Sequence, residues 1–157
     1  MILSLISIVV IFFCGYILIE DKRYIYYVDN GNSKFINLVI PGIGLDVLIY
    51  NFDSIYNDVD YNVSLLDSSD LDSNTYYFAS HSGTGDNCYF NRVKEIEVGD
   101  VVYVFYKNNR LVYEVVDKYF IVKNGYMEVD KYLEDVLFLI TCSGYNQQLI
   151  VKGLLIN

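Results

Sequence analysis

The amino-acid sequence predicts an all-β domain, closed into a barrel or folded as a sandwich. Aromatic residues make up 17% of the 157-residue chain, with 17 Tyr and 9 Phe, and aromatic and β-branched residues favour strands. Short apolar runs are separated by turns rich in Gly, Asn, Asp and Ser, as is typical of barrels and sandwiches. The sequence contains no internal repeat and no long amphipathic helical pattern that would favour another fold class.

The first half of the chain supplies three candidate strands. Residues 34–40 form an apolar run that ends at the Pro-Gly turn of 41–44, and a second run occupies 45–50. Residues 51–74 contain six Asp and no Lys or Arg, which predicts a loop-rich region. A compact apolar strand at 75–79 then leads into a loop rich in Ser and Gly.

The second half continues the pattern of short strands and turns. Residues 88–96 favour a short helix, because their apolar residues recur near one face. Residues 99–122 read as two or three strands, in which the sequence "KNNR" forms a hairpin turn. One helical turn is expected at 128–135, and the last two strands are expected at 136–142 and 148–156.

Length and charge limit the classes of function. The chain is long enough for one compact domain. It carries 11 basic and 20 acidic residues, for a formal net charge of −9. Because nucleic-acid binding needs a basic face, the sequence argues against a nucleic-acid partner.

The N-terminal segment predicts a membrane anchor. Residues 2–19 carry no charged side chain, and at about 1.5 Å per residue they nearly span a hydrocarbon core of about 30 Å. No small-residue cleavage site follows. We therefore expect a transmembrane helix or signal anchor at 1–19 and a linker at 20–33, with a buried helix or a cleaved signal peptide as alternatives. Lys22 and Arg23, which follow the helix, weakly favour a cytoplasmic domain.

The chain has three cysteines, Cys14, Cys88 and Cys142. An odd number argues against a disulfide framework, although a single pair between Cys88 and Cys142 stays open. Cys14 lies within the apolar N-terminal segment and is expected to behave as a small hydrophobic residue.

Cys142 and His81 form the candidate catalytic pair. Each lies at the end of a predicted strand, and His81 is the only histidine in the sequence. A nucleophilic cysteine needs a thiolate or a base that generates one, and an imidazole is the usual partner. Proximity in space, rather than chain order, decides whether such a pair functions. The alternative is a core thiol and a surface histidine that have no chemical connection.

Three stretches resemble the sortase family. "LITC" at 139–142, followed by a polar turn and "LIVKG", is similar to the last four positions of the family's T-L-x-T-C signature. Residues 76–104 resemble its histidine region, with an apolar strand, the histidine, a small-residue loop, an aromatic residue and "GD" before a strand. Residues 36–50 resemble the opening strands. The resemblance extends over about residues 34–156.

The resemblance implies a closed eight-stranded sortase-type barrel over residues 34–157, with His81 and Cys142 at one end of neighbouring strands. It implies an enzyme anchored in the cell membrane of a Gram-positive cell, with its catalytic domain on the extracellular face. This orientation is opposite to the cytoplasmic one that Lys22 and Arg23 weakly favour, and we follow the resemblance. Cys142 would attack a sorting signal related to Leu-Pro-x-Thr-Gly and form a thioacyl enzyme. His81 would act as general acid and base while an amine of a peptidoglycan precursor or a pilin accepts the surface protein.

The sequence departs from the family at one functional position. Sortases carry an arginine on the strand after the cysteine, and aligning "QLIVKG" with "RLIVRG" places Gln148 there. A neutral amide lacks the forked, charge-assisted hydrogen bonds of a guanidinium. Three interpretations stay open: Gln148 is a weaker substitute, a cation from Lys152, Arg92 or Arg110 reaches the site, or activity is lost. Thr141 is a candidate for oxyanion support, or is simply a β-branched strand residue.

The acidic segment raises the question of a metal. Carboxylates are calcium ligands, and some sortases use calcium near such a loop; the candidate ligands here are Asp58, Asp60, Asp67, Asp70 and Asp72. Their spacing does not match an EF-hand loop. We therefore expect a solvated acidic loop and no cofactor, with calcium as the alternative.

Three functions follow from these observations. The first is a membrane-anchored cysteine transpeptidase in which Cys142 and His81 are catalytic and Gln148 and Thr141 support the oxyanion and the peptide. The second is a catalytically weakened or inactive sortase-fold module that binds peptides, which the missing arginine motivates. The third is a cysteine protease that hydrolyses its acyl-enzyme.

Overall fold

The computed structural model describes residues 35–124 and 134–157. The membrane helix expected at 1–19 and the linker expected at 20–33 lie outside the described residues, as does most of the helical turn expected at 128–135. Within the described ranges, the structure contains no helix with the length and apolar character needed to span a membrane.

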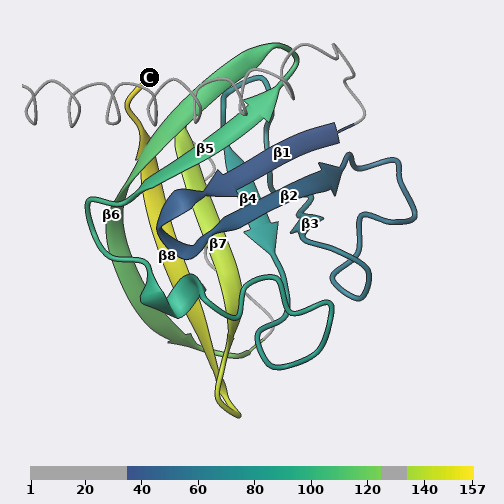
Figure 1. Cartoon of the computed structure of the whole chain (residues 1–157), viewed down its shortest axis with the longest axis vertical. Coiled ribbons are helices and arrows are strands. Elements are labelled where there is room, and N and C mark those ends of the chain that lie inside the picture. The colour runs from purple at the N-terminus through teal and green to yellow at the C-terminus, as the bar shows by residue number, and fades with distance from the viewer. Residues whose placement is uncertain (1–34, 125–133) are drawn as a thin grey trace, which may run out of the picture.

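Across the described residues, eight strands form one sheet that curls into a nearly closed barrel (Figure 1). The strand order is β2-β1-β5-β6-β8-β7-β4-β3. All neighbours are antiparallel except β4 and β7, which run parallel. The strands are β1 (Phe35–Ile40), β2 (Leu45–Tyr50), β3 (Ser64–Leu65), β4 (Tyr76–Ala79), β5 (Val101–Tyr106), β6 (Asn109–Val122), β7 (Val136–Ser143) and β8 (Gln147–Leu155). The expected all-β barrel is confirmed, except that its closure is incomplete.

Side-chain amides replace backbone pairing where the barrel is incomplete, between the edge strands β2 and β3. Asn62, which lies just before β3, donates from Nδ2 to the Leu48 carbonyl on β2 at 2.6 Å. Asn57 pairs with the backbone of Leu65, accepting from its N–H at 2.7 Å and donating to its carbonyl at 2.9 Å. The loop between β2 and β3 thus satisfies edge groups that would otherwise be open to pairing with another chain.

Strand β7 is an uninterrupted apolar run because both of its faces are covered. Leu137 and Leu139 point into the barrel and join the main core. Val136, Phe138 and Ile140 point outward, where they belong to a second buried cluster. This two-sided burial explains why the sequence lacks the apolar-polar alternation of a strand with one wet face.

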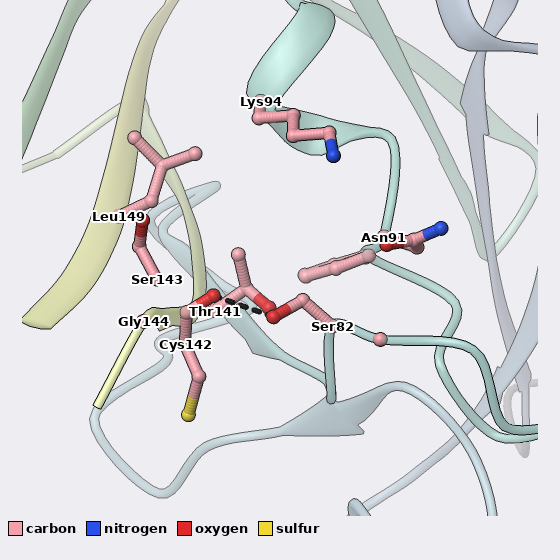
Figure 2. Close-up of a pocket in the computed structure, with 10 residues that line it drawn as sticks. Ser82, Asn91, Lys94, Thr141, Cys142, Ser143, Gly144 and Leu149 are labelled. Atoms are coloured by element: carbon pink, nitrogen blue, oxygen red, sulfur yellow. Dashed lines mark hydrogen bonds between the residues drawn. The ribbon is translucent and has the colours of Figure 1, made fainter.

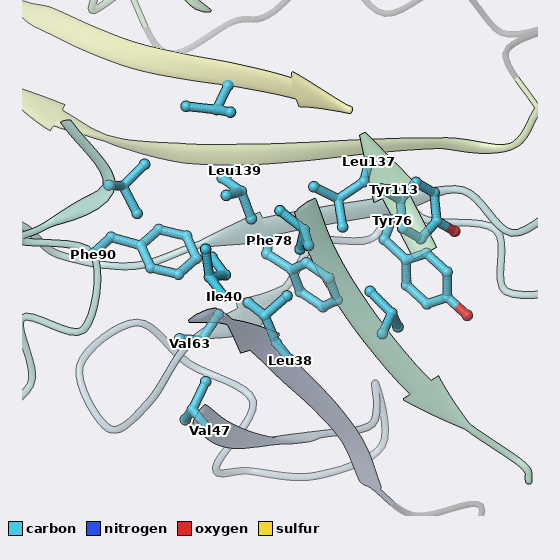
Figure 3. Packing of buried hydrophobic residues seen from close by; sticks show 14 of the residues in the cluster. Leu38, Ile40, Val47, Val63, Tyr76, Phe78, Phe90, Tyr113, Leu137 and Leu139 are labelled. Carbon is cyan, nitrogen blue, oxygen red and sulfur yellow. The ribbon is translucent and has the colours of Figure 1, made fainter. Parts of the chain in front are cut away.

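The main core fills the barrel with side chains from strands that are distant in the sequence. Figure 3 shows Leu38 of β1, Phe78 of β4, Tyr113 of β6 and Leu139 of β7 within the same buried cluster inside the barrel. All four side chains are fully buried. The core therefore fixes the relative positions of the strands, including β4 and β7, from which the candidate site is built.

The short helix expected at 88–96 is confirmed only over its last part. These residues form successive turns that end in a short 3-10 helix, η2 (Val93–Glu95). Phe90, Val93 and Ile96 are fully buried, and a spacing of three residues suits the three-residue turn of a 3-10 helix better than an α-helix. The hairpin expected at "KNNR" is confirmed, since β5 and β6 meet at Lys107 and Asn108, which have φ of 47° and 66°.

Candidate active site

His81 and Cys142 lie at the same end of the barrel because β4 and β7 run parallel. In the register of these strands Ala79 lies opposite Ile140, so two residues further along each chain His81 lies level with Cys142. The Ser80 N–H continues the pairing with a hydrogen bond of 3.3 Å to the Ile140 carbonyl. This end of the barrel is the one from which the turn between β7 and β8 projects at the bottom of Figure 1.

Two hydroxyl groups hold the ends of β4 and β7 together beyond the last ladder bond. Thr141 Oγ1 donates to the Ser80 carbonyl at 2.8 Å, and Thr141 is 4% exposed. Ser82 Oγ donates to the Cys142 carbonyl, the dashed contact in Figure 2. Each bond joins a residue beside His81 to Cys142 or its neighbour, so together they set the separation of the two candidate catalytic residues.

Cys142 is the second-last residue of β7 and carries a partly exposed, free thiol. Cys88 is also a free, partly exposed thiol, so the two do not form the disulfide that the cysteine count left open. Gln148 of β8 is the register partner of Cys142. Side chains directly opposite in an antiparallel pair share a face of the sheet, so the Gln148 amide and the thiol project from the same face.

A lysine that the sequence analysis did not single out contacts the thiol. Lys123 Nζ lies 3.5 Å from Cys142 Sγ. Lys123 follows the last residue of β6, and its N–H donates to the Asn146 carbonyl in the turn between β7 and β8 at 3.0 Å. No local sequence pattern indicates Lys123. Its contact with the thiol depends on the register of three adjacent strands, in which the end of β6 meets the start of β8.

His81 is held by a carboxylate from the loop between β2 and β3. Its Nε2 lies 3.1 Å from Asp60 Oδ1, and the side chains are 45% and 76% exposed. The Asp60 carbonyl accepts a hydrogen bond from Asn87 Nδ2, which ties the acidic loop to the loop after His81. Among the described residues no hydrogen bond joins His81 to Cys142, and catalytic hydrogen bonds are often formed only when a substrate is bound.

A pocket of about 240 Å³ lies beside the Cys142 backbone. It is lined by Ser82, Gly83, Phe90, Asn91, Lys94, Thr141, Cys142, Ser143, Gly144 and Leu149. In Figure 2 the Cys142 sulfur points away from the side on which Lys94 lies. Cys142 and Lys94 thus both line the pocket, with the sulfur directed away from Lys94.

The second buried apolar cluster adjoins the thiol on the outer side of the sheet. Ile140 and Phe138 precede Cys142 on that face, and the Phe138 ring stacks on Tyr77 of β4 with ring centres 4.8 Å apart. Tyr119 packs at its margin, and burial, aided by the charge of Asp117, raises its pKa.

The other cations proposed as arginine substitutes are held elsewhere. Arg92 bonds to Glu95 at 2.7 Å and to the Ile43 carbonyl at 2.7 Å. The hydrogen bond from Arg92 lowers the pKa of Glu95. Arg110 lies over the ring of Tyr103, 5.4 Å from its centre, near the hairpin that begins β6. Lys152 lies 6.0 Å from the centre of the Phe138 ring.

The acidic loop shows no metal centre among the described residues. No group of three or more His, Cys, Asp or Glu side chains lies close enough together there to hold an ion. Instead, Asp58 Oδ1 accepts from the Asp60 N–H at 2.9 Å, and Asp70 Oδ1 accepts from the Asp72 N–H at 3.1 Å. These are turn-forming interactions typical of Asp.

A free cysteine and a histidine at adjacent ends of parallel strands define the kind of site that forms covalent acyl intermediates. The sortase domain family matches residues 38–156. Since this match covers most of the chain, the chain belongs to the sortase family. No curated protein sequence matches it.

Solved sortase structures have the same fold. The chain is similar to sortase C2 of pilus island 1 of Group B Streptococcus, with 25% identity and a TM-score of 0.69, over 80% of this chain and 76% of that one. It is also similar to sortase C-1 of Actinomyces oris, with 25% identity and a TM-score of 0.66, over 87% and 81%. Sortase C1 of Streptococcus agalactiae shares 23% identity at a TM-score of 0.64, over 77% of this chain but only 66% of that chain's length.

Proposed function

We propose that this protein is a cysteine transpeptidase that cleaves a sorting signal related to Leu-Pro-x-Thr-Gly and transfers the acyl group to an amine. The observation that carries the proposal is the parallel pairing of β4 and β7, which brings His81 level with the free thiol of Cys142. Membership of the sortase family supports this class of reaction.

In the first step, the Cys142 sulfur attacks the carbonyl carbon of the scissile peptide bond. A new S–C bond forms, the C–N bond breaks, and the leaving amine takes a proton from His81. In the second step, an acceptor amine attacks the thioester carbonyl, gives up a proton to His81, and displaces the sulfur. In the first half His81 takes the proton of the Cys142 thiol and gives it to the leaving amine. In the second half it takes a proton from the acceptor amine and gives it to the departing sulfur, so protons balance over a full turnover.

Asp60 is a positioning residue in this scheme. Its Oδ1 lies 3.1 Å from His81 Nε2, and this contact orients the imidazole ring that donates to the leaving amine. Because both side chains are largely exposed, this contribution is modest.

Gln148 and Thr141 take different supporting roles. Gln148 projects from the same face as the thiol, where its amide is placed to donate one neutral hydrogen bond to the peptide or the oxyanion. The Thr141 hydroxyl is engaged with the Ser80 carbonyl, so we assign it to holding the strand ends in register, in place of the direct oxyanion contact expected from sequence.

We further propose that the acyl donor is a surface protein with a C-terminal sorting signal, and that the acceptor is an amine of a peptidoglycan precursor or a pilin. The predicted helix at 1–19 would anchor the enzyme in the membrane with this domain on the extracellular face. No cofactor enters the scheme. The likeness to sortase C2 of a streptococcal pilus island supports this partner class.

The replacement of the family's arginine by Gln148 favours a second candidate, a peptide-binding module with weak or no turnover. Incubating the full-length protein with Leu-Pro-x-Thr-Gly-like peptides, with and without oligoglycine, separates the candidates. Transfer products that require Cys142 and His81 support the transpeptidase. Hydrolysis that added amine does not divert indicates a protease, and binding without either product indicates the module.

A further inference from the structure

We infer that Lys123 is a catalytic residue, which supplies the positive charge at Cys142 that the family's arginine supplies elsewhere. The inference rests on the proposed function and on one contact, the 3.5 Å between Lys123 Nζ and Cys142 Sγ. An ammonium group at this distance touches a reacting atom, and it has three donors and no acceptor. It is therefore suited to stabilise negative charge on the sulfur and on the carbonyl oxygen of the scissile peptide bond in the substrate.

The register of β6, β8 and β7 explains how a residue two strands away reaches the thiol. Ile121 of β6 lies opposite Gln148 of β8, and Gln148 lies opposite Cys142 of β7. Lys123 lies two residues beyond Ile121, so it starts from the same face of the sheet. Adjacent strands are about 5 Å apart, and the four-carbon lysine stem crosses β8 beside Gln148.

The backbone of Lys123 is fixed although its side chain is exposed. Its N–H donates to the Asn146 carbonyl in the turn between β7 and β8 at 3.0 Å, and β6 ends beside that turn (Figure 1). The turn begins immediately after Cys142 and Ser143. The same short segment thus fixes the origin of the ammonium group and the position of the thiol.

The charges around the site leave Lys123 available for this role. Among the described residues, Lys123 is not part of the ion pairs that involve the site: Asp60 pairs with His81, and Glu95 pairs with Arg92. Lys152, the other lysine on this face of the barrel, lies over Phe138. The thiol therefore has one cation in contact with it, and that cation has no competing carboxylate within the described residues.

The chemistry divides the arginine's task between two side chains. When the sulfur attacks, negative charge moves from the sulfur to the carbonyl oxygen. When the C–N bond breaks, the C=O bond re-forms and the electron pair leaves with the amine nitrogen, which His81 protonates. Lys123 supplies the charge, and Gln148 supplies an oriented neutral donor from the same face. A flexible ammonium lacks the fixed fork of a guanidinium, so the amide retains the geometric role.

The first measurement uses the protein without any substrate. The rates at which iodoacetate and iodoacetamide alkylate Cys142 in the full-length chain are followed by site-resolved mass spectrometry, with Cys88 in the same molecule as internal control. The anionic reagent is attracted by the ammonium, and the neutral one is not. Lys123→Met should lower the iodoacetate-to-iodoacetamide rate ratio at Cys142 about fivefold, the attraction of two unit charges about 4 Å apart in water. Lys123→Arg and Lys152→Met should leave the ratio unchanged.

The second measurement is peptide transfer by the same variants. Lys123→Met should lower kcat/KM at least tenfold, toward the roughly 10²–10³ lost when an oxyanion donor is removed, and Lys123→Arg should restore most of it. The inference is overturned if Lys123→Met leaves the iodoacetate-to-iodoacetamide rate ratio at Cys142 unchanged. It is also overturned if the kcat/KM of this variant for peptide transfer stays within twofold of the wild-type value. If the wild type transfers no peptide, the proposed function fails, and the alkylation ratio still decides whether Lys123 places a charge at Cys142.

Discussion

The hydrogen bond from Thr141 to Ser80 should contribute to both stability and activity. Thr141→Val keeps the volume of the side chain and removes the donor, leaving the carbonyl of a buried residue without the 2.8 Å bond. An intramolecular hydrogen bond contributes about 0.5–1.5 kcal/mol, and a buried group left unsatisfied costs about 1–3 kcal/mol. We therefore expect the free energy of unfolding to fall by about 1–3 kcal/mol.

The matched control is Thr141→Ser, which keeps the hydroxyl and removes one methyl group. Its loss should be about 0.8 kcal/mol, the value of one buried CH₂ group. In transfer assays the two variants should separate further. Loosening the bond beside His81 misplaces the imidazole relative to Cys142, and a displacement of about 1 Å costs up to about 10²-fold in rate. Thr141→Ser should retain most of the activity.

Denaturant unfolding and peptide transfer, measured on both variants, test this reasoning. If Thr141→Val is as stable as the wild type, the hydroxyl contributes nothing to holding the strand ends. If the two variants lose activity equally, the methyl group rather than the hydrogen bond matters, and the positioning role assigned to Thr141 is wrong.

Three further predictions concern the charges and phenols of the barrel. Asp60→Asn should lower transfer only about two- to fivefold, because an exposed ion pair with His81 is worth about 0.2–1 kcal/mol; a loss above 10²-fold would contradict this, and the effect should shrink in high salt. Gln148→Arg should raise the transfer rate less than threefold in the wild-type protein, because Lys123 already places a cation at the thiol. In Lys123→Met the same substitution should raise the rate at least tenfold. A large gain in the wild-type protein would point instead to a decayed site. Burial, together with nearby charges, raises the pKa of Tyr113 above its ordinary value. The phenol therefore ionises first in the unfolded chain, and the free energy of unfolding should fall as the pH rises above about 10. Urea titrations at pH 8 to 11 should show a smaller fall in the free energy of unfolding for Tyr113→Phe.

The strands and the positions of His81 and Cys142 at strand ends could be predicted from sequence because their signals are local. The apolar run before Cys142 and the one before His81 each end where a strand ends. The expected bounds of 45–50 and 136–142 agree with β2 and β7 to within one residue. The turn at Lys107 and Asn108 was predictable because Asn tolerates the positive φ that it adopts there.

What sequence could not supply depends on tertiary pairing. The two-residue strand β3 has no periodicity to detect and exists because β4 lies beside it. Asp60 was considered only as a metal ligand, although the fold brings it to His81 across the loop between β2 and β3. Lys123 reaches Cys142 only through the register of three strands, whereas the cations that the sequence offered were Lys152, Arg92 and Arg110. Such contacts are set by which strands become neighbours, which local patterns do not encode.

The most direct test of the central claim is intact-mass analysis of the full-length protein incubated with Leu-Pro-x-Thr-Gly-like peptides. The account predicts a covalent adduct with the mass of the acyl fragment, located on Cys142, absent in Cys142→Ala, and discharged when oligoglycine is added. His81→Ala should reduce its formation, because the leaving amine then lacks its proton donor. Peptide binding without an adduct on Cys142 in the wild type would contradict the account.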